Sequence, residues 1–306
     1  MMYFWKYPSA VFRAVLSALG IVLVLGLSGC GIFGSDGKDE EREEAKLLTE
    51  KQLYEKVQEL LDDERFELAV KNLQLLESRF PFGAYATQSQ LEIIYAYFRN
   101  GEEEGAISAA ERFLRLHPRH RDADYAWYMK GLANYPLEPG MLNRFYESDF
   151  AARDVSSARQ SFREFQEFLR LYPESPYAAD ARARMIHIRH ILARHEVIVA
   201  NYYIKRRAYT AAVARAQSVV EHYQGSEAVS DALAVLAYCY GAMGLEAEAE
   251  RAVAILDENY PEHEVLTAGG EFRYPMEFDA GKRSLTNRLS LGLLDAPRAP
   301  QFDSRR

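Results

Sequence analysis

The chain has 306 residues, of which 48% are hydrophobic and 27% are charged, so most of it can fold, as two ordinary domains or one elongated array. The net charge of −8 argues against a general nucleic-acid binder, because such a protein needs a basic surface to contact phosphates. Of the two cysteines, Cys30 ends an apolar run, whereas Cys239 lies inside an apolar helical stretch. We therefore expect Cys239 to be a small buried side chain and not a nucleophile.

Residues 1–29 are predicted to form a lipoprotein signal peptide. Lys6 and Arg13 supply a positive flank, residues 11–27 are almost wholly apolar, and the segment ends in Leu-Ser-Gly-Cys30. This ending resembles a bacterial lipobox, which implies that Cys30 becomes the acylated N-terminus of the mature protein. The alternative is a transmembrane helix, but the uninterrupted apolar core, residues 15–27, is short for the roughly 20 residues that a spanning helix needs.

Residues 30–46 are predicted to be a flexible, lipidated tether, because they are rich in Gly, Asp, Glu and Lys and contain almost no apolar side chains. Gly31, and not an aspartate, follows Cys30. By analogy with the bacterial sorting rule, this favours a lipid anchor in the outer membrane, on its periplasmic face.

From residue 47 to about residue 261 the apolar pattern is helical and it repeats. Five segments place a small residue twelve positions before the proline or turn that ends a predicted helix: Ala69 and Pro81, Ala106 and Pro118, Ser161 and Pro173, Ala212 and Gln224, and Ala249 and Pro261. Counted back from the small residue, a turn glycine lies at the fifth position and a tyrosine at the ninth: Gly101 and Gly244; Tyr97, Tyr203 and Tyr240. This is the tetratricopeptide pattern, in which a small residue lets two helices approach closely and proline ends the second one. We predict an all-α tetratricopeptide-repeat solenoid of about five helix pairs.

Two repeats are longer than the tetratricopeptide unit, and the tail lacks the pattern. An insertion between Tyr135 and Ser157 divides the two helices of the third repeat, and long loops of this kind usually carry function or a brace. Residues 177–203 are predicted to form one long helix that joins the third repeat to the fourth. Residues 263–306 show little sustained periodicity and are predicted to be mostly disordered.

Several segments resemble one known family. They are residues 79–85, Arg-Phe-Pro-Phe-Gly-Ala-Tyr; residues 90–98; residues 128–132, Tyr-Met-Lys-Gly-Leu; and residues 149–165, in that order. Together with the lipobox, they resemble the BamD family, the tetratricopeptide lipoproteins of the β-barrel assembly machine, over about residues 16–262. The tail is longer than this resemblance leads us to expect.

The resemblance implies an outer-membrane scaffold that works by binding other proteins and needs no cofactor. The implied partners are the barrel subunit BamA, other lipoproteins of the assembly complex, and unfolded outer-membrane proteins with a C-terminal targeting signal. The N-terminal repeats, residues 47–175, would face substrate, and the C-terminal repeats, residues 176–262, would face the barrel subunit.

The first helices of the repeats are rich in tyrosine, whose broad apolar ring and hydroxyl suit the binding of varied extended peptides. A signal that ends in an aromatic residue and a carboxylate needs an aromatic pocket beside arginines. The candidate substrate-binding residues are Tyr85, Tyr95, Tyr97, Arg99, Arg112, Arg115 and Tyr128. The alternatives are that the tyrosines fill the wedge between helices and that the arginines form a solvated surface.

Arg215 is the candidate contact with the barrel subunit, because it is a lone cation among the small residues Ala211, Ala212, Ala214 and Ala216. A merely exposed arginine is the alternative.

The sequence contains no catalytic constellation. Gly-x-Ser-x-Gly, Walker-type, Cys-x-x-Cys and His-Glu-x-x-His motifs are absent. His187 and His190 have a spacing that can share a metal ion, but the neighbouring arginines disfavour a dication, and we predict no metal site. One alternative is another envelope tetratricopeptide lipoprotein, which scaffolds cell-wall synthesis or division. An enzyme with appended repeats is disfavoured, since no remaining stretch is long enough for a catalytic domain.

Overall fold

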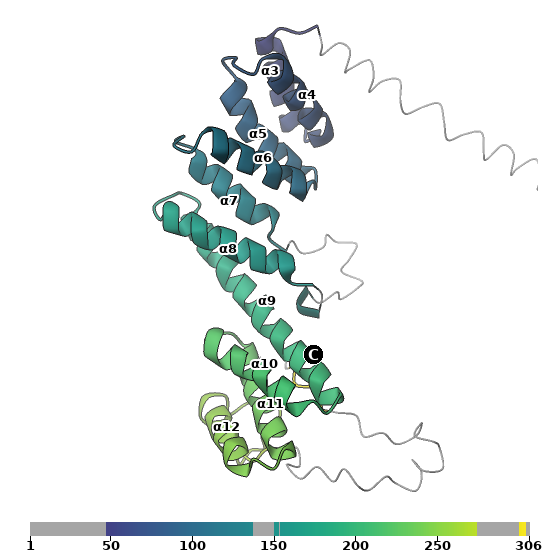
Figure 1. Cartoon of the computed structure of the whole chain (residues 1–306), viewed down its shortest axis with the longest axis vertical. Coiled ribbons are helices and arrows are strands. Elements are labelled where there is room, and N and C mark those ends of the chain that lie inside the picture. Colours follow the sequence, from purple (N-terminus) through teal and green to yellow (C-terminus); the bar gives the residue numbers. More distant parts are fainter. Residues whose placement is uncertain (1–46, 137–149, 153, 274–299, 304–306) are drawn as a thin grey trace, which may run out of the picture. The chain divides into compact units, whose positions relative to one another are not determined.

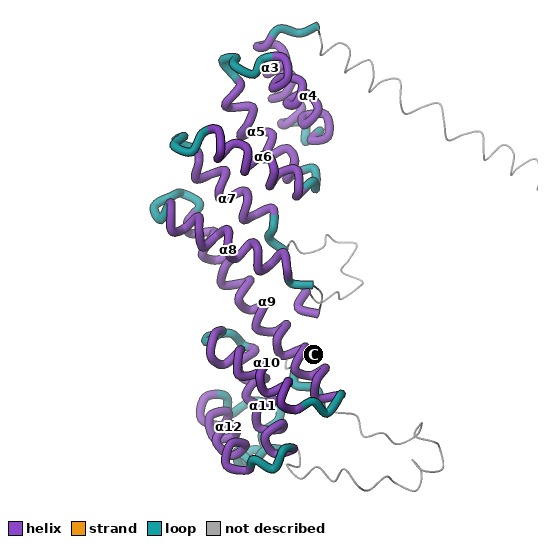
Figure 2. Tube along the Cα trace, in the orientation of Figure 1, coloured by secondary structure: helices purple, strands orange, loops and turns teal. Residues whose placement is uncertain are grey.

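The computed structural model describes residues 47–136, 150–152, 154–273 and 300–303, and within these ranges the regular elements are helices (Figures 1 and 2). A single antiparallel bridge, between Leu266 and Phe272, is added. No helix in the described ranges is both long and apolar enough to cross a membrane. The predicted signal peptide, the tether and Cys30 lie outside these ranges.

The chain forms two compact units, Met1–Gly101 and Glu102–Arg306. The described helices of the first unit are α3 (Glu50–Asp62), α4 (Phe66–Arg79) and α5 (Ala86–Arg99). Those of the second unit are α6 (Glu103–Leu116), α7 (Ala123–Ala133), the short 3-10 helix η2 (Phe150–Ala152), α8 (Ser156–Leu171), α9 (Ala178–Lys205), α10 (Tyr209–His222), α11 (Ala228–Ala242) and α12 (Glu246–Asn259). Within each unit every helix packs on the next one along the chain. The predicted all-α, tetratricopeptide-type fold is confirmed; the predicted functional boundary after residue 175 stays a prediction.

The small residue of each repeat lies where helices cross. Ala69, Ala106, Ser161, Ala212 and Ala249 are all 0% exposed. At the closest approach of α7 and α8, the Ser161 hydroxyl donates a 2.7 Å hydrogen bond to the Gly131 carbonyl. A Cβ on Gly131 would lie 2.6 Å from the Phe165 ring, so only glycine fits at this crossing without movement of that ring.

The helix ends follow the proline rule that the sequence indicated. The helices α4, α6, α8 and α12 end two residues before Pro81, Pro118, Pro173 and Pro261. A proline lacks the N–H of the helical ladder and disfavours helical backbone in the residue before it. The second helix of each of these pairs therefore ends at the predicted place.

The turns inside the repeats share a left-handed residue. Gly101 and Gly244 both have φ +74°, as the sharp predicted turns require. The same position of the repeat carries Glu64, with φ +57°, and Arg207, with φ +59°. The sequence analysis did not anticipate these two turns, because a glutamate and an arginine give no local signal of left-handed backbone.

The two enlargements lie where they were predicted. Helix α9 runs unbroken over Ala178–Lys205, and α7 and α8 are separated by the insertion in the third repeat. Of the insertion, residues 137–149 and 153 lie outside the described ranges. The described residue Ala151, in η2, is buried, and its carbonyl lies 2.7 Å from His195 Nδ1 on α9.

Part of the tail differs from the expectation of disorder. Residues 263–273 fold back over the end of the repeats, with Val265 and Leu266 buried. Phe302 is 0% exposed and packs into the apolar core of α9–α12. A single anchoring side chain has no period, so periodicity does not reveal it. Residues 274–299 and 304–306 lie outside the described ranges.

Candidate interaction surfaces

In the first unit, Arg99 lies on two aromatic rings at the C-terminal end of α5. Its guanidinium carbon is 4.5 Å from the Phe66 ring centroid and 5.5 Å from that of Tyr95. Arg99 Nη2 is 3.0 Å from Glu64 Oε1, and this hydrogen bond raises the pKa of Arg99 further above its ordinary value. The Arg99 side chain is 37% exposed. We call Glu64, Phe66, Tyr95 and Arg99 the arginine–aromatic cluster; it joins two of the predicted substrate residues.

Tyr85 and Tyr97 are held by packing and hydrogen bonds in the same unit. The Tyr85 ring stacks on Tyr54 at 4.3 Å, and its backbone N–H donates a 2.9 Å bond to Glu50 Oε1. The Tyr97 hydroxyl accepts a 2.6 Å bond from Gln74 Nε2.

The contact of Tyr97 recurs in another repeat. Tyr240 accepts an equivalent 2.9 Å bond from Gln217 Nε2. Since both pairs are 23 residues apart, this contact is a feature of the repeat and locks its first helix to the preceding one. This bond favours the wedge interpretation for Tyr97.

In the second unit, Tyr128 is a packing residue. Its side chain is 9% exposed and its ring stacks on Tyr177 with centroids 4.8 Å apart. The hydroxyl donates a 2.7 Å hydrogen bond to Asp180 Oδ2. Burial, and then this bond, raise the pKa of Tyr128 to about 12. The structure favours the wedge interpretation for this tyrosine.

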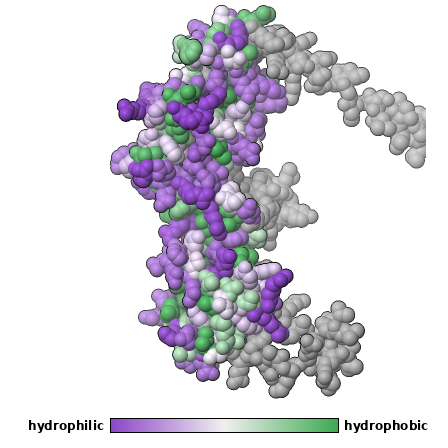
Figure 3. Space-filling view, in the orientation of Figure 1, coloured by the Kyte–Doolittle hydropathy of each residue, from purple (hydrophilic) through white to green (hydrophobic). Residues whose placement is uncertain are grey.

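Arg112 and Arg115 lie on α6 in the second unit, whereas Arg99 lies in the first. The Arg115 side chain is exposed and that of Arg112 is partly exposed. On the face shown in Figure 3, hydrophilic residues cover most of the surface over α6 to α8. Hydrophobic residues appear there as small separate patches. The predicted substrate set is therefore divided between two units, each of which has its own exposed arginine.

A buried cation ties three helices of the second unit together. Lys130 Nζ lies 3.1 Å from both Glu111 Oε1 on α6 and Glu164 Oε1 on α8, and the lysine side chain is 14% exposed. Burial opposes the charge of Lys130, but the two hydrogen bonds outweigh it and raise the pKa. The sequence analysis missed this network, because its three members come from different helices.

Arg215 is not the lone cation that the sequence suggested. Its Nη1 lies 2.9 Å from Glu196 Oε2, while Arg159 Nη2 lies 3.1 Å from Glu196 Oε1. The Glu196 side chain is 8% exposed, whereas those of Arg159 and Arg215 are 45% and 44% exposed. The hydrogen bond to Glu196 raises the pKa of Arg215. This arginine–glutamate triad, Arg159, Glu196 and Arg215, joins α8, α9 and α10 and presents two cations to solvent.

The histidines of α9 point to different partners. His190 Nδ1 is 3.3 Å from Ser226 Oγ, and His195 Nδ1 is 2.7 Å from the Ala151 carbonyl. Within the described ranges no group of three or more His, Cys, Asp or Glu side chains is placed to hold a metal ion.

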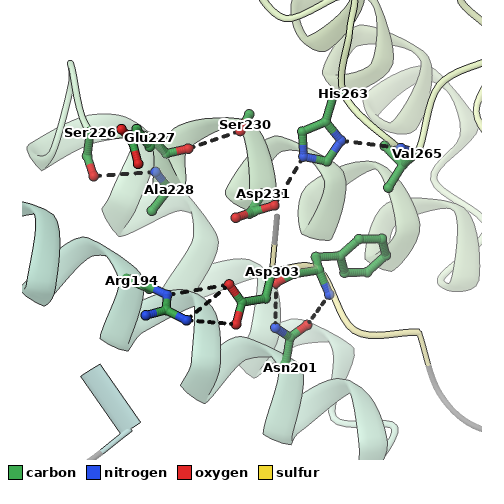
Figure 4. Close-up of polar contacts among 11 residues, drawn as sticks. Arg194, Asn201, Ser226, Glu227, Ala228, Ser230, Asp231, His263, Val265 and Asp303 are labelled. Carbon is green, nitrogen blue, oxygen red and sulfur yellow. Dashed lines mark hydrogen bonds and ion pairs between the residues drawn. The ribbon is translucent and has the colours of Figure 1, made fainter. Parts of the chain in front are cut away.

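A further polar site, which the sequence analysis missed, joins α9 to the C-terminal tail (Figure 4). Arg194 Nη2 lies 3.2 Å from Asp303 Oδ2, and Asn201 bonds the main chain of Phe302. The only signal in the sequence is one aromatic residue in an otherwise polar end, Gln301-Phe302-Asp303-Ser304-Arg305-Arg306.

Paired helices with buried small residues, left-handed turns and exposed arginines define a helical-repeat protein of the tetratricopeptide class. Residues 47–255 match the YfiO family, described as outer membrane lipoprotein, and the chain belongs to this family. The chain is 38% identical over 249 residues to "Outer membrane protein assembly factor BamD" of Neisseria meningitidis serogroup A, a match that covers 81% of this chain and 92% of that protein. It is 34% identical over 208 residues to the protein of the same name from Vibrio cholerae, with coverages of 68% and 86%. The resemblance to BamD is confirmed.

Proposed function

We propose that this protein is a lipid-anchored scaffold of outer-membrane β-barrel assembly. It binds a BamA-like barrel subunit, other lipoproteins of the complex and unfolded outer-membrane proteins, and it promotes their folding and insertion without catalysing a reaction. The observation that carries the proposal is that relatives named as outer membrane protein assembly factors match this chain over as much as 92% of their length. In this proposal Cys30 carries the lipid, and the repeats lie on the periplasmic face of the outer membrane.

The arginine–aromatic cluster supports a role of residues 47–175 in binding unfolded substrate. The aromatic rings of Phe66 and Tyr95 hold one face of the Arg99 guanidinium, and Glu64 fixes its direction. The remaining donors of the guanidinium can bind a peptide carboxylate or main-chain carbonyl. Because the side chain is pre-positioned, little rotamer entropy is lost when a peptide binds.

The arginine–glutamate triad supports a role of residues 176–262 in binding the barrel subunit. Glu196 holds Arg215 in place, and the half-exposed guanidinium offers further donors to an acidic partner surface. Complementary charge at such a surface accelerates association and fixes the register of the two proteins.

The first experiment is affinity purification of the chain from detergent-solubilised outer membranes, with mass spectrometry of the partners. Recovery of a BamA-like subunit in near-equal amount is expected. Recovery of cell-wall synthesis or division enzymes without that subunit would overturn the assignment to barrel assembly and leave an envelope scaffold of another kind.

The substrate-binding residues are tested by photo-crosslinking of a radiolabelled unfolded β-barrel protein to the purified chain. Arg99→Ala and the double variant Arg112→Glu, Arg115→Glu are expected to lower crosslinking at least threefold. Arg251→Ala is the matched control, because Arg251 is 70% exposed and pairs only locally with Glu248. Unchanged crosslinking in folded variants of all three arginines would contradict their predicted role.

A further inference from the structure

Residues 300–303 lie against α9 and α11 in the second unit, more than 100 positions along the chain from their hydrogen-bond partner Asn201. The three kinds of contact that they make are those by which proteins recognise an extended peptide. They are a main-chain contact, an aromatic side chain in an apolar site, and a carboxylate on an arginine.

Asn201 supplies the main-chain contact. Its Nδ2 donates a 2.8 Å hydrogen bond to the Phe302 carbonyl, and its Oδ1 accepts a 3.1 Å bond from the Phe302 N–H. The amide is 3% exposed. A side-chain amide that satisfies both polar groups of one peptide unit holds an extended strand whatever its sequence, and it would be left unsatisfied if nothing lay there.

The aromatic position is deep and specific for a ring. Phe302 is 0% exposed, and its ring centroid lies 5.8 Å from that of Tyr238 and 6.5 Å from that of Phe272. Tyr238 belongs to α11, whereas Phe272 comes from the segment that folds back after α12. Burial of one ring here contributes most of the apolar area that a short segment can offer.

Arg194 supplies the carboxylate contact. Its guanidinium lies over both carboxylate oxygens of Asp303, with Nη2 3.2 Å from Oδ2 and Nε 3.4 Å from Oδ1. The side chains are 23% and 10% exposed. Figure 4 shows Arg194 and Asn201 pointing at the tail from one helix. A pocket continues beyond Asp303, lined by His190, Ser226, Glu227, Ala228 and Asp231, so there is room beside the carboxylate.

We infer that Arg194, Asn201, Tyr238 and Phe272 form a peptide-recognition site for an extended segment of a partner protein with an aromatic residue followed by an acidic one, and that this chain's own Phe302-Asp303 occupies the site until the partner displaces it. The inference rests on the seated tail and is independent of the proposed role in barrel assembly. A tethered segment competes at an effective concentration of about millimolar, so the site appears weak to any free peptide until the tail is removed.

The test uses the full mature chain and a fluorescein-labelled peptide with the sequence of residues 300–306, Pro-Gln-Phe-Asp-Ser-Arg-Arg. The double variant Phe302→Ala, Asp303→Ala empties the site, and fluorescence anisotropy is expected to show at least tenfold tighter peptide binding than to the unaltered chain. Replacing Phe by Ala or Asp by Asn in the peptide is expected to weaken binding at least tenfold. Adding Arg194→Ala to the protein is expected to abolish the preference for Asp over Asn.

Two outcomes would overturn the inference. If the double variant is folded by circular dichroism but binds the peptide no better than the unaltered chain, residues 300–303 are only a structural strap. If the double variant does not fold, the single variant Asp303→Ala, which removes only the ion pair, decides the question. It is expected to bind the peptide at least threefold tighter than the unaltered chain, and equal binding rejects the site.

Discussion

Burial changes the chemistry of single side chains in this protein, and Cys239 and Tyr128 are the clearest cases. Cys239 is 0% exposed on α11, and burial raises its pKa to about 12. Tyr128 keeps its proton to a similar pKa because it is buried and donates to Asp180. Neither side chain offers a reactive or readily accessible group, so both are better explained by packing than by recognition.

Cys239 is expected not to react with a thiol reagent in the folded protein. The thiolate is the nucleophile, and a pKa of about 12 leaves almost none of it at pH 8. In a Cys30→Ser variant, where Cys239 is the remaining thiol, Ellman's reagent should detect less than a tenth of a thiol per chain in buffer and one in 6 M guanidinium chloride. A full reaction in buffer would show that α11 opens readily.

Tyr128→Phe is expected to lower the unfolding free energy by about 1 kcal/mol at pH 7, the usual contribution of one hydrogen bond. The ordinary pKa is 10.0 and the folded value about 12, so the tyrosine's contribution is complete below pH 10 and is lost as pH rises from 10 to 12. Tyr128→Phe should therefore lose less stability than the unaltered chain between those pH values. Urea titrations at pH 7 and at pH 11 measure this, with Tyr202→Phe as control, since Tyr202 is 51% exposed.

At the scale of the helices, the repeat uses glycine for two different reasons. Gly244 has φ +74° with no atom within 4 Å of a built Cβ, so its backbone conformation alone requires glycine. Gly131 has ordinary helical backbone, but the Phe165 ring lies 2.6 Å from its built Cβ, so space requires it. Glu64 and Arg207 show that the turn itself tolerates other residues, at some cost in backbone strain.

The two glycines are expected to respond differently to substitution. Gly244→Ala should cost about 1 kcal/mol through the left-handed backbone, and Gly244→Asn less, because asparagine tolerates that conformation. Gly131→Ala should cost about 1–3 kcal/mol through overpacking against Phe165, and Gly131→Asn more. Equal losses for alanine and asparagine at both positions in chemical unfolding would contradict this assignment.

The arginine–glutamate triad links three helices, so the choice of substitution at Arg215 matters. Arg215→Gln leaves Glu196 paired with Arg159 and should cost at most about 1 kcal/mol, as for other exposed ion pairs. Arg215→Glu sets a second carboxylate beside the buried one and should lower the melting temperature further. If Arg215 contacts the barrel subunit, Arg215→Gln weakens co-purification while the melting temperature stays nearly constant. Full co-purification of Arg215→Gln would leave the arginine with a structural role.

At the scale of the whole molecule, the tail reinforces one unit and not the other. Phe302 packs with residues of α9–α12 and the segment after α12, all of which belong to the second unit. Phe302→Ala should cost about 3 kcal/mol, a typical value for a buried phenylalanine. Hydrogen exchange in α9 and α11 should then accelerate, while exchange in α3–α5 stays unchanged.

Phe82→Ala in the first unit is the control for this prediction. Phe82 is 98% exposed, so its loss should change stability by less than about 0.5 kcal/mol. An equal acceleration of exchange in both units of the Phe302→Ala variant would show that the two units unfold together.

The sequence by itself determined the helices, their ends and the small residues between them, because these depend on local rules. A proline twelve residues after an alanine or serine ends a helix wherever the repeat occurs, and the spacing identifies the buried position. Only the tertiary structure decided which charges are paired and which aromatic residues are buried. Glu196 joins arginines from two other helices, and Phe302 reaches Asn201 across 101 residues. Such contacts have no period along the chain, since they depend on where distant helices place their side chains in space.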